Sequence, residues 1–214
     1  MRKLVLRMSI SLDGFVAGPN GEVDWIFRNR GADSTEWIVD TLRQAGALAM
    51  GSRSYYDMAA FWPYSETPFA PPMNDKPKIV FSRNGIKDGT QVGIPARALA
   101  DAKKDRIGEQ QSVTPTEAVL RSWAEPTVAC GDLVEEVARL KEQPGDFIAA
   151  LGGASFAQSL AAAGLIDEYR LVVHPVALGR GLPLFSGLPR SLILCLVSRV
   201  SFGSGAVGEV YRVA

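Results

Sequence analysis

Short apolar segments alternate with stretches of helical periodicity along most of this 214-residue chain. Branched and apolar residues bounded by turn residues are typical of strands buried in a sheet. On this pattern we expect strands over residues 3–12, 47–50, 78–81, 127–130, 147–151, 169–176, 192–200 and 208–213. The last two would form a terminal hairpin around Gly203-Ser204-Gly205.

Helices are predicted between several of these strands. The run from Asp33 to Glu36 has the oxygen-bearing side chains that cap a helix, and Gly46 is a suitable end for it. Residues 133–141 carry one apolar side, and residues 156–163 form a small-residue helix closed by Gly164. Strands that alternate with helices indicate an α/β fold, with an antiparallel edge from the terminal hairpin.

Two segments lack this regularity. Residues 61–77 contain five prolines and are predicted to form an irregular loop. Residues from about 84 to 122 are polar and glycine-containing, and we interpret them as a surface insertion with one or two short helices. The length fits one domain over residues 1–214 that carries this insertion.

Composition narrows the classes of function. Lys+Arg and Asp+Glu are 23 each, so the basic excess of a general nucleic-acid binder is missing. No apolar run approaches the roughly 20 residues of a membrane span, and Arg7 interrupts any apolar core of a signal peptide. Cys130 and Cys195 lie far apart in the sequence, which favours buried thiols in a reducing compartment. We expect a cytoplasmic protein without nucleic-acid or membrane partners.

Three predicted strands end in glycine or small hydroxyl residues. These ends are Gly51-Ser52-Arg53-Ser54, Ser82-Arg83 and Gly152-Gly153-Ala154-Ser155. In open α/β sheets ligands bind outside the carboxyl ends of strands, where glycine lets the backbone approach a phosphate. Arg53 and Arg83 would add donors for it. The pattern favours a phosphorylated, dinucleotide-like ligand, with a tight strand-to-helix turn and solvated arginines as the alternative.

Several familiar motifs are missing from the sequence. There is no GxGxxG after the first strand, no GxxxxGK[ST] and no GxSxG. The chain has one histidine, His174, so a histidine-based metal cluster is excluded and we expect no metal. The zinc signature of nucleobase deaminases is also missing.

Ordered motifs carry a family resemblance over nearly the whole chain except residues 84–122. They are Met8-Ser-Ile-Ser-Leu-Asp-Gly-Phe-Val-Ala-Gly18, Val23-Asp-Trp25, Met50-Gly51, Lys78-Ile-Val-Phe-Ser-Arg83, Leu151-Gly-Gly-Ala154 and the run from Gly164 to Phe185. Together they resemble the dihydrofolate reductase-like family that includes the riboflavin-biosynthesis deaminase-reductase C-terminal domain, and most closely its stand-alone bacterial members. The resemblance implies a three-layer fold, with about eight mostly parallel strands in a central mixed sheet and helices on both faces.

The resemblance also implies NADPH as cofactor, bound across the strand ends. Carried over by position, it places Ser11 and Leu12 near the nicotinamide and Gly152–Ser155 at the pyrophosphate. The segment Gly51–Ser54 would hold the pyrophosphate and the 2′-phosphate side, and Ser82 and Arg83 would line the adenosine pocket. The family commonly has a basic residue where this chain has Ser52, which leaves Arg53 and Arg83 to pair with the 2′-phosphate.

A reduction also needs a proton. In folate-reducing relatives a carboxylate on the first helix supplies it, so Asp33 and Glu36 are catalytic candidates, with a capping role as the alternative. Asp13 and Trp25 are candidates for the substrate pocket. Their alternatives are an Asx-type turn for Asp13 and a core position for Trp25.

The sequence thus predicts an NADPH-dependent oxidoreductase that transfers a hydride to a small heterocyclic or imine substrate. The resemblance suggests a pterin, or 5-amino-6-(5-phosphoribosylamino)uracil as in riboflavin biosynthesis, where the activity is that of a pyrimidine reductase. The alternative is a catalytically silent nucleotide-binding protein on the same scaffold. The family resemblance further implies a homodimer.

Overall fold

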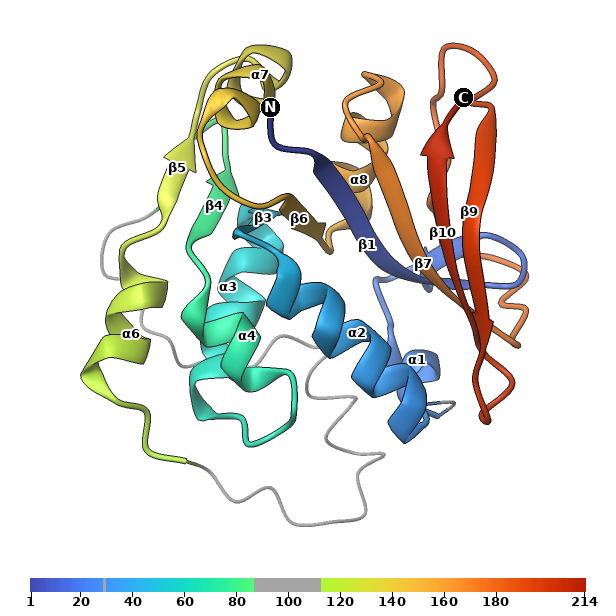
Figure 1. Ribbon diagram of the computed structural model, residues 1–214, viewed down its shortest axis with the longest axis horizontal. Coiled ribbons are helices and arrows are strands. Elements are labelled where there is room, and N and C mark those ends of the chain that lie inside the picture. The colour runs from blue at the N-terminus through green and yellow to red at the C-terminus, as the bar shows by residue number, and fades with distance from the viewer. Residues whose placement is uncertain (29, 87–112) are drawn as a thin grey trace.

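The computed structural model describes residues 1–28, 30–86 and 113–214 (Figure 1). Its main sheet contains β1 (Leu4–Ser11), β3 (Ala47–Gly51), β4 (Lys78–Phe81), β5 (Thr127–Ala129), β6 (Ile148–Leu151), β7 (Glu168–His174), β9 (Leu194–Ser201) and β10 (Val207–Val213). The strand order is β5-β4-β3-β6-β1-β7-β10-β9. The first six are parallel, and β10 pairs antiparallel with both β7 and β9. The expected eight-stranded, mostly parallel sheet with a terminal hairpin is confirmed.

Helices cover both faces of this sheet (Figure 1). One face packs against α2 (Ala32–Gln44), α3 (Ser52–Phe61), α4 (Ala70–Asp75) and α6 (Glu117–Ala124). The other packs against α7 (Leu133–Glu142) and α8 (Ala154–Ala162). The short elements are α1 (Asp24–Arg28), the 3-10 helix η1 (Trp62–Tyr64), and a separate pair of strands, β2 (Phe15–Ala17) and β8 (Leu182–Pro183). The result is the three-layer arrangement that the resemblance implied.

The central strand β1 lies between β6 and β7 and is covered on both faces. Its side chains alternate, because successive residues of a strand point to opposite faces. Leu6 and Met8 pack in the core under α7 and α8. Arg7 and Ser9 therefore face the layer that contains α2. A polar stripe on a buried face of a central strand is unusual.

The residues that start and end α2 act for other reasons than the sequence predicted. The helix begins at Ala32, where Ser34 Oγ accepts the N–H of Gly31 at 3.0 Å, so Asp33 lies inside the first turn rather than at the cap. Gly46 does follow the helix, but its φ is not positive. A Cβ there would lie 2.8 Å from the carbonyl oxygen of Asp146, so close approach of two backbones requires glycine.

The prediction of an irregular loop over residues 61–77 was wrong in part, because η1 and α4 lie within it. Pro71 and Pro72 occupy the first turn of α4, where a missing N–H removes no helical hydrogen bond. Pro72 and Met73 are buried, so the short helix contributes to the core.

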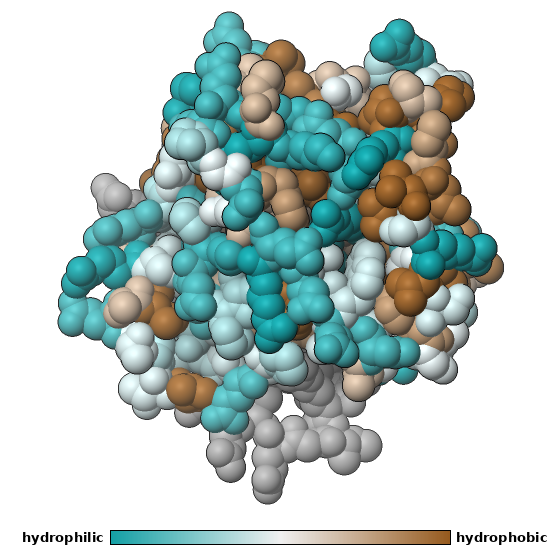
Figure 2. Space-filling model, in the orientation of Figure 1, coloured by the Kyte–Doolittle hydropathy of each residue, from teal (hydrophilic) through white to brown (hydrophobic). Residues whose placement is uncertain are grey.

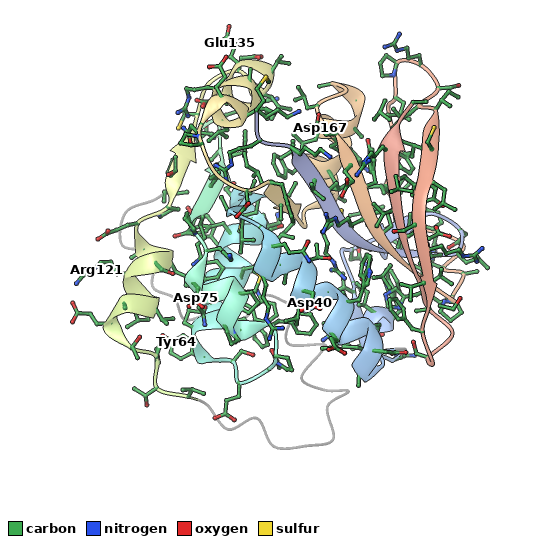
Figure 3. The ribbon with its side chains drawn as sticks, in the orientation of Figure 1. Asp40, Tyr64, Asp75, Arg121, Glu135 and Asp167 are labelled. Carbon is green, nitrogen blue, oxygen red and sulfur yellow. The ribbon has the colours of Figure 1, made fainter. Side chains whose placement is uncertain are left out.

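The segment predicted as an insertion is described only at its ends, because residues 87–112 lie outside the described residues. Residues 117–122 belong to α6. In this helix Arg121 projects into solvent and pairs with Glu117, while Trp123 is buried (Figure 3). Ser122 Oγ donates to the carbonyl of Asn74, which ties α6 to α4.

The two cysteines are free, and both are exposed, which corrects the expectation of buried thiols. Cys195 lies on the edge strand β9, and Cys130 follows β5 at the opposite edge. In the part of the chain that the structure describes, no helix is long and apolar enough to cross a bilayer.

Candidate functional site

The carboxyl ends of β3 and β6 lie close together, and each runs directly into a helix. A Cβ built on Gly51 would lie 3.4 Å from Cβ of Phe156 in α8. A Cβ built on Gly153 would lie 3.0 Å from Oγ of Ser54 in α3. The structure therefore brings together the predicted segments Gly51–Ser54 and Gly152–Ser155, which are far apart in the sequence.

Backbone geometry explains the pair of glycines at the end of β6. Gly152 and Gly153 have φ of +59° and +82°, in the region that side chains rarely adopt. Ser54 is in contact distance of both positions. Only glycine fits these two positions of the turn from β6 to α8, which packs against α3.

Both helices that start here lack a side-chain cap within the described residues. By contrast, Thr116 caps α6, and Asp132 accepts the N–H groups of Val134 and Glu135 in α7. Uncapped N–H groups and the positive ends of two helix dipoles thus point at one place, which favours a bound anion. This is the arrangement expected of a pyrophosphate cradle.

The end of β4 adjoins the same place. The ring of Phe81 lies 4.9 Å from that of Phe156. Ser82 Oγ donates to the carbonyl of Gly85 at 2.5 Å, so its hydroxyl stabilises the turn after β4. Arg83 is exposed, as is Arg53 at the start of α3. Both guanidinium groups are accessible to an anion at this edge of the sheet.

The end of β1 is held by a carboxylate. Ser11 is buried and donates to Asp13 at 2.6 Å. Asp13 accepts the N–H groups of Leu178 at 3.1 Å and Gly179 at 2.7 Å. The hydrogen bond from Ser11, with those from the backbone, lowers the pKa of Asp13 to about 2. Asp13 therefore fixes the loop after β7 against the end of β1. Leu12, between Ser11 and Asp13 in the sequence, is 72% exposed, so an apolar side chain is uncovered where the nicotinamide is expected.

Trp25 is buried in α1, and its ring meets that of His174 edge-on at 5.4 Å. His174 ends β7, directly opposite Ser11 in the register of the two strands. Trp25 thus covers the ends of β1 and β7, so it is a core residue that also adjoins the candidate site.

Asp33 and Glu36 are both exposed on α2. Asp33 accepts the N–H of Gly203 in the β9–β10 turn at 2.7 Å and that of Ser34 at 2.8 Å. These hydrogen bonds lower its pKa. A general acid needs a raised pKa, so the surroundings of Asp33 favour a structural role over proton donation.

Asp57 is a carboxyl group that sequence reasoning missed. It is half-buried on α3, one turn after Ser54. Burial raises its pKa, against the opposing charge of Arg53. Among the carboxyl groups in the described residues it alone has a resolved upward shift. Nothing in the sequence marks it, because the shift comes from packing.

Arg7 and His174 were also missed as a pair. Both lie on the α2 side of the sheet, and the charge of Arg7 helps to lower the pKa of His174. One signal was available: Arg7, Ser9 and Ser11 occupy alternate positions of a strand that was expected to be buried.

Relatives extend over almost the whole chain. The uncharacterized protein YyaP of Bacillus subtilis (strain 168) is 32% identical over 216 residues, which cover 99% of this chain and 95% of YyaP. A solved structure from Shewanella sp. PV-4, provisionally assigned to riboflavin biosynthesis, matches with a TM-score of 0.69 at 19% identity, covering 100% of this chain and 99% of that one.

A second solved structure is a deaminase/5-amino-6-(5-phosphoribosylamino)uracil reductase from Thermotoga maritima. It matches with a TM-score of 0.65 at 15% identity, and the match covers 100% of this chain and 57% of that one. At these identities the two solved structures establish the fold. The model of the family described as the RibD C-terminal domain matches residues 2–207. The chain therefore belongs to the RibD C-terminal domain family, on the scaffold of the riboflavin-biosynthesis reductases.

Proposed function

We propose that this protein is an NADPH-dependent reductase that transfers a hydride to a small heterocyclic or imine substrate. The observation that carries the proposal is the meeting of two uncapped helix N-termini at Ser54 and Gly153. Membership of a reductase family supports the same conclusion. The substrates named by the resemblance are a pterin and a phosphoribosylaminouracil.

The residues present fit a dinucleotide phosphate. Gly152 and Gly153 would let the backbone approach the pyrophosphate, and the N–H groups that begin α3 and α8 would donate to it. Arg53 and Arg83 would pair with the 2′-phosphate. Bound NADPH supplies the hydride from C4 of its nicotinamide. Ser11 and Leu12 would position that ring at the end of β1.

The proton needs a donor of the chain's own or solvent. Asp57 is half-buried, and burial raises its pKa, so its surroundings favour the protonated form more than those of Asp33 do. We therefore propose Asp57, in place of Asp33 and Glu36, as the carboxyl group to test for proton donation. In an Asp57→Asn variant we expect kcat to fall about 100-fold or more with unchanged NADPH affinity. Asp33→Asn is the matched control, and equal kcat in the two variants would reject this assignment.

The binding test comes first. Titration with NADPH and NADH, followed through the four tryptophans and by calorimetry, should show micromolar NADPH binding, about −8 kcal/mol, with much weaker NADH binding. Arg53→Ala and Arg83→Ala should reduce that preference. Failure of both nucleotides to bind at millimolar concentration would reject the reductase.

A catalytically silent nucleotide-binding protein remains the second candidate, because Asp33 has a lowered rather than a raised pKa. The two candidates differ in a substrate screen by loss of NADPH absorbance. A protein that binds NADPH and turns over no pterin or aminouracil substrate would favour the silent alternative.

We also propose that two copies associate through β9. This edge strand is exposed along nearly its whole length, and apolar residues gather over the β9–β10 hairpin (Figure 2). The exposed apolar residues there are Ile193, Leu196, Val197, Val200 and Val213. An apolar strand with free backbone groups at the edge of a sheet is suited to pairing with a second copy. Mass in solution tests the proposal, and 23.0 kDa would reject it.

A further inference from the structure

Arg7 and His174 are polar residues placed inside the face of the sheet that packs under α2. Arg7 lies in the middle of β1 and His174 at the end of the adjacent strand β7. Alternation along the two strands directs both side chains to the same face. Trp25 of α1 packs edge-on against His174 from the helix layer.

Four side-chain nitrogen atoms of these two residues lack partners within the described residues. In the described part of the chain five buried side-chain polar atoms make no hydrogen bond, and four of them are Nε and Nη2 of Arg7 and Nδ1 and Nε2 of His174. Burying a donor without a partner is unfavourable, and a guanidinium group is the most unfavourable case. Four such atoms on two side chains of adjacent strands, on the same face of the sheet, indicate a missing partner.

Positive charges act on both side chains. Burial, followed by the positive charge of Arg30, lowers the pKa of Arg7 to about 9. Burial, followed by the charges of Arg7 and Arg30, lowers the pKa of His174 to about 4. No carboxylate of the described residues contributes to either shift. Arg30 is held in place because its guanidinium lies 4.7 Å from the ring centres of Phe27 and Phe69.

Nearby polar groups make hydrogen bonds to other partners. Ser11 Oγ donates to Asp13, and the carboxylate of Asp13 accepts backbone N–H groups of the loop after β7. Arg7 as a residue is still partly exposed, although its Nε and Nη2 are buried. A partner with negative charge would satisfy these nitrogens and balance the positive charge.

We propose that Arg7 and His174 bind an oxyanion group of the substrate, a carboxylate or a phosphate. The guanidinium fork donates two N–H groups to such an anion, and neutral His174 donates a third. The inference rests on the proposed reductase function, since it places this group beside the end of β1, where the nicotinamide would lie. It favours an anionic substrate over a pterin, whose amino group would need a carboxylate here.

The single histidine allows a direct test, because the imidazole resonances in an NMR spectrum can come only from His174. The pKa of His174 is measured alone, with inorganic phosphate and with acetate. We expect the bound anion to raise it by about one unit or more. An effect of phosphate alone assigns a phosphate group, and an effect of both ions admits a carboxylate. No shift with either ion overturns the proposal.

Variants separate binding from structure. Arg7→Met should raise the pKa of His174 without any anion, because a positive neighbour is removed, and should abolish the further shift on adding anion. Its Tm should also rise, since a buried unpaired charge becomes an apolar group of similar volume. Arg7→Lys should restore part of the anion shift, and Arg139→Met on the surface of α7 should change nothing. A lowered Tm of Arg7→Met, with the anion shift retained, would show that Arg7 is structural.

The same samples are titrated with NADPH. We expect Arg7→Met to bind NADPH as the wild type does. If the wild type responds to the anion and does not bind NADPH, the reductase is rejected and the anion site stands. If NADPH binds and neither anion shifts the pKa of His174, the anion site is rejected and the reductase proposal stands.

Discussion

Gly153 provides the sharpest test of the nucleotide cradle. An alanine there would have to adopt φ +82°, which is unfavourable by about 1–3 kcal/mol for a residue with a side chain. Its Cβ would also lie 3.0 Å from Ser54 Oγ, closer than ordinary contact, so the Ser54 side chain at the start of α3 would have to shift. For a domain of this size, each kcal/mol lowers Tm by about 2–4 °C.

A shift of Ser54 and a Cβ inside the turn should also weaken binding of the pyrophosphate. Loss of one charge-assisted hydrogen bond from a backbone N–H to the pyrophosphate corresponds to about 1.5–3 kcal/mol, or at least about tenfold in Kd for NADPH. We expect Gly153→Ala to show both effects. Calorimetry measures the Kd and thermal unfolding measures the Tm.

Gly164→Ala is the matched control. Gly164 follows α8 at its other end and has φ +67°, but a Cβ there would have nothing within 4 Å. Its Tm should fall by a comparable amount while its NADPH affinity stays at the wild-type value. If the two variants bind NADPH equally well, the Gly152–Ser155 turn is not the pyrophosphate site.

Three further changes probe the fold and the assembly. Asp13 has a pKa of about 2 in the folded state, against an ordinary 3.8, so its ionised form stabilises the protein above about pH 4. This contribution is lost as the pH falls toward 2, and Asp13→Ala should flatten that part of a curve of stability against pH. Tyr55→Phe removes the hydroxyl that donates to the carbonyl of Trp123, and denaturant unfolding should show a loss of about 1–3 kcal/mol. Leu196→Asp on β9 should give a monomer by light scattering. Val134→Asp on α7 should leave the dimer intact, although the two side chains are similarly exposed, at 53% and 50%. An unchanged mass for Leu196→Asp would place the interface elsewhere.

Elements with a clear local signal could be predicted from the sequence. The strand over residues 78–81 matches β4, and the helix over 133–141 matches α7 to within one residue, because both have an apolar period and definite ends. The helix α4 escaped prediction because prolines suggest a loop, yet they fit its first turn. The strands β2 and β8 have three and two residues, too few for any periodicity to show.

In the candidate site, too, features with a local signal could be predicted and features set by tertiary packing could not. Its glycine turns could be found because positive φ and close approach restrict the residue locally. The relation of Gly153 to Ser54 is tertiary, and so are the surroundings that give Asp33 and Asp57 opposite pKa shifts. A sequence shows which carboxyl groups exist, and only the packed chain shows which one is desolvated.

Arg7 lies between these two cases. A strand at the centre of a sheet covered on both faces should be apolar throughout, so an arginine there contradicts the local rule. Within residues 1–28, 30–86 and 113–214, two buried nitrogens of Arg7 have no partner. The same is true of both ring nitrogens of His174 on the adjacent strand. Other polar side chains of the core do find partners: Lys78, for example, is buried and donates to Asn74 and Ser122. Within the described residues the core satisfies Lys78 and leaves nitrogens of Arg7 and His174 unsatisfied, and this contrast supports the proposal that the pair binds an anion.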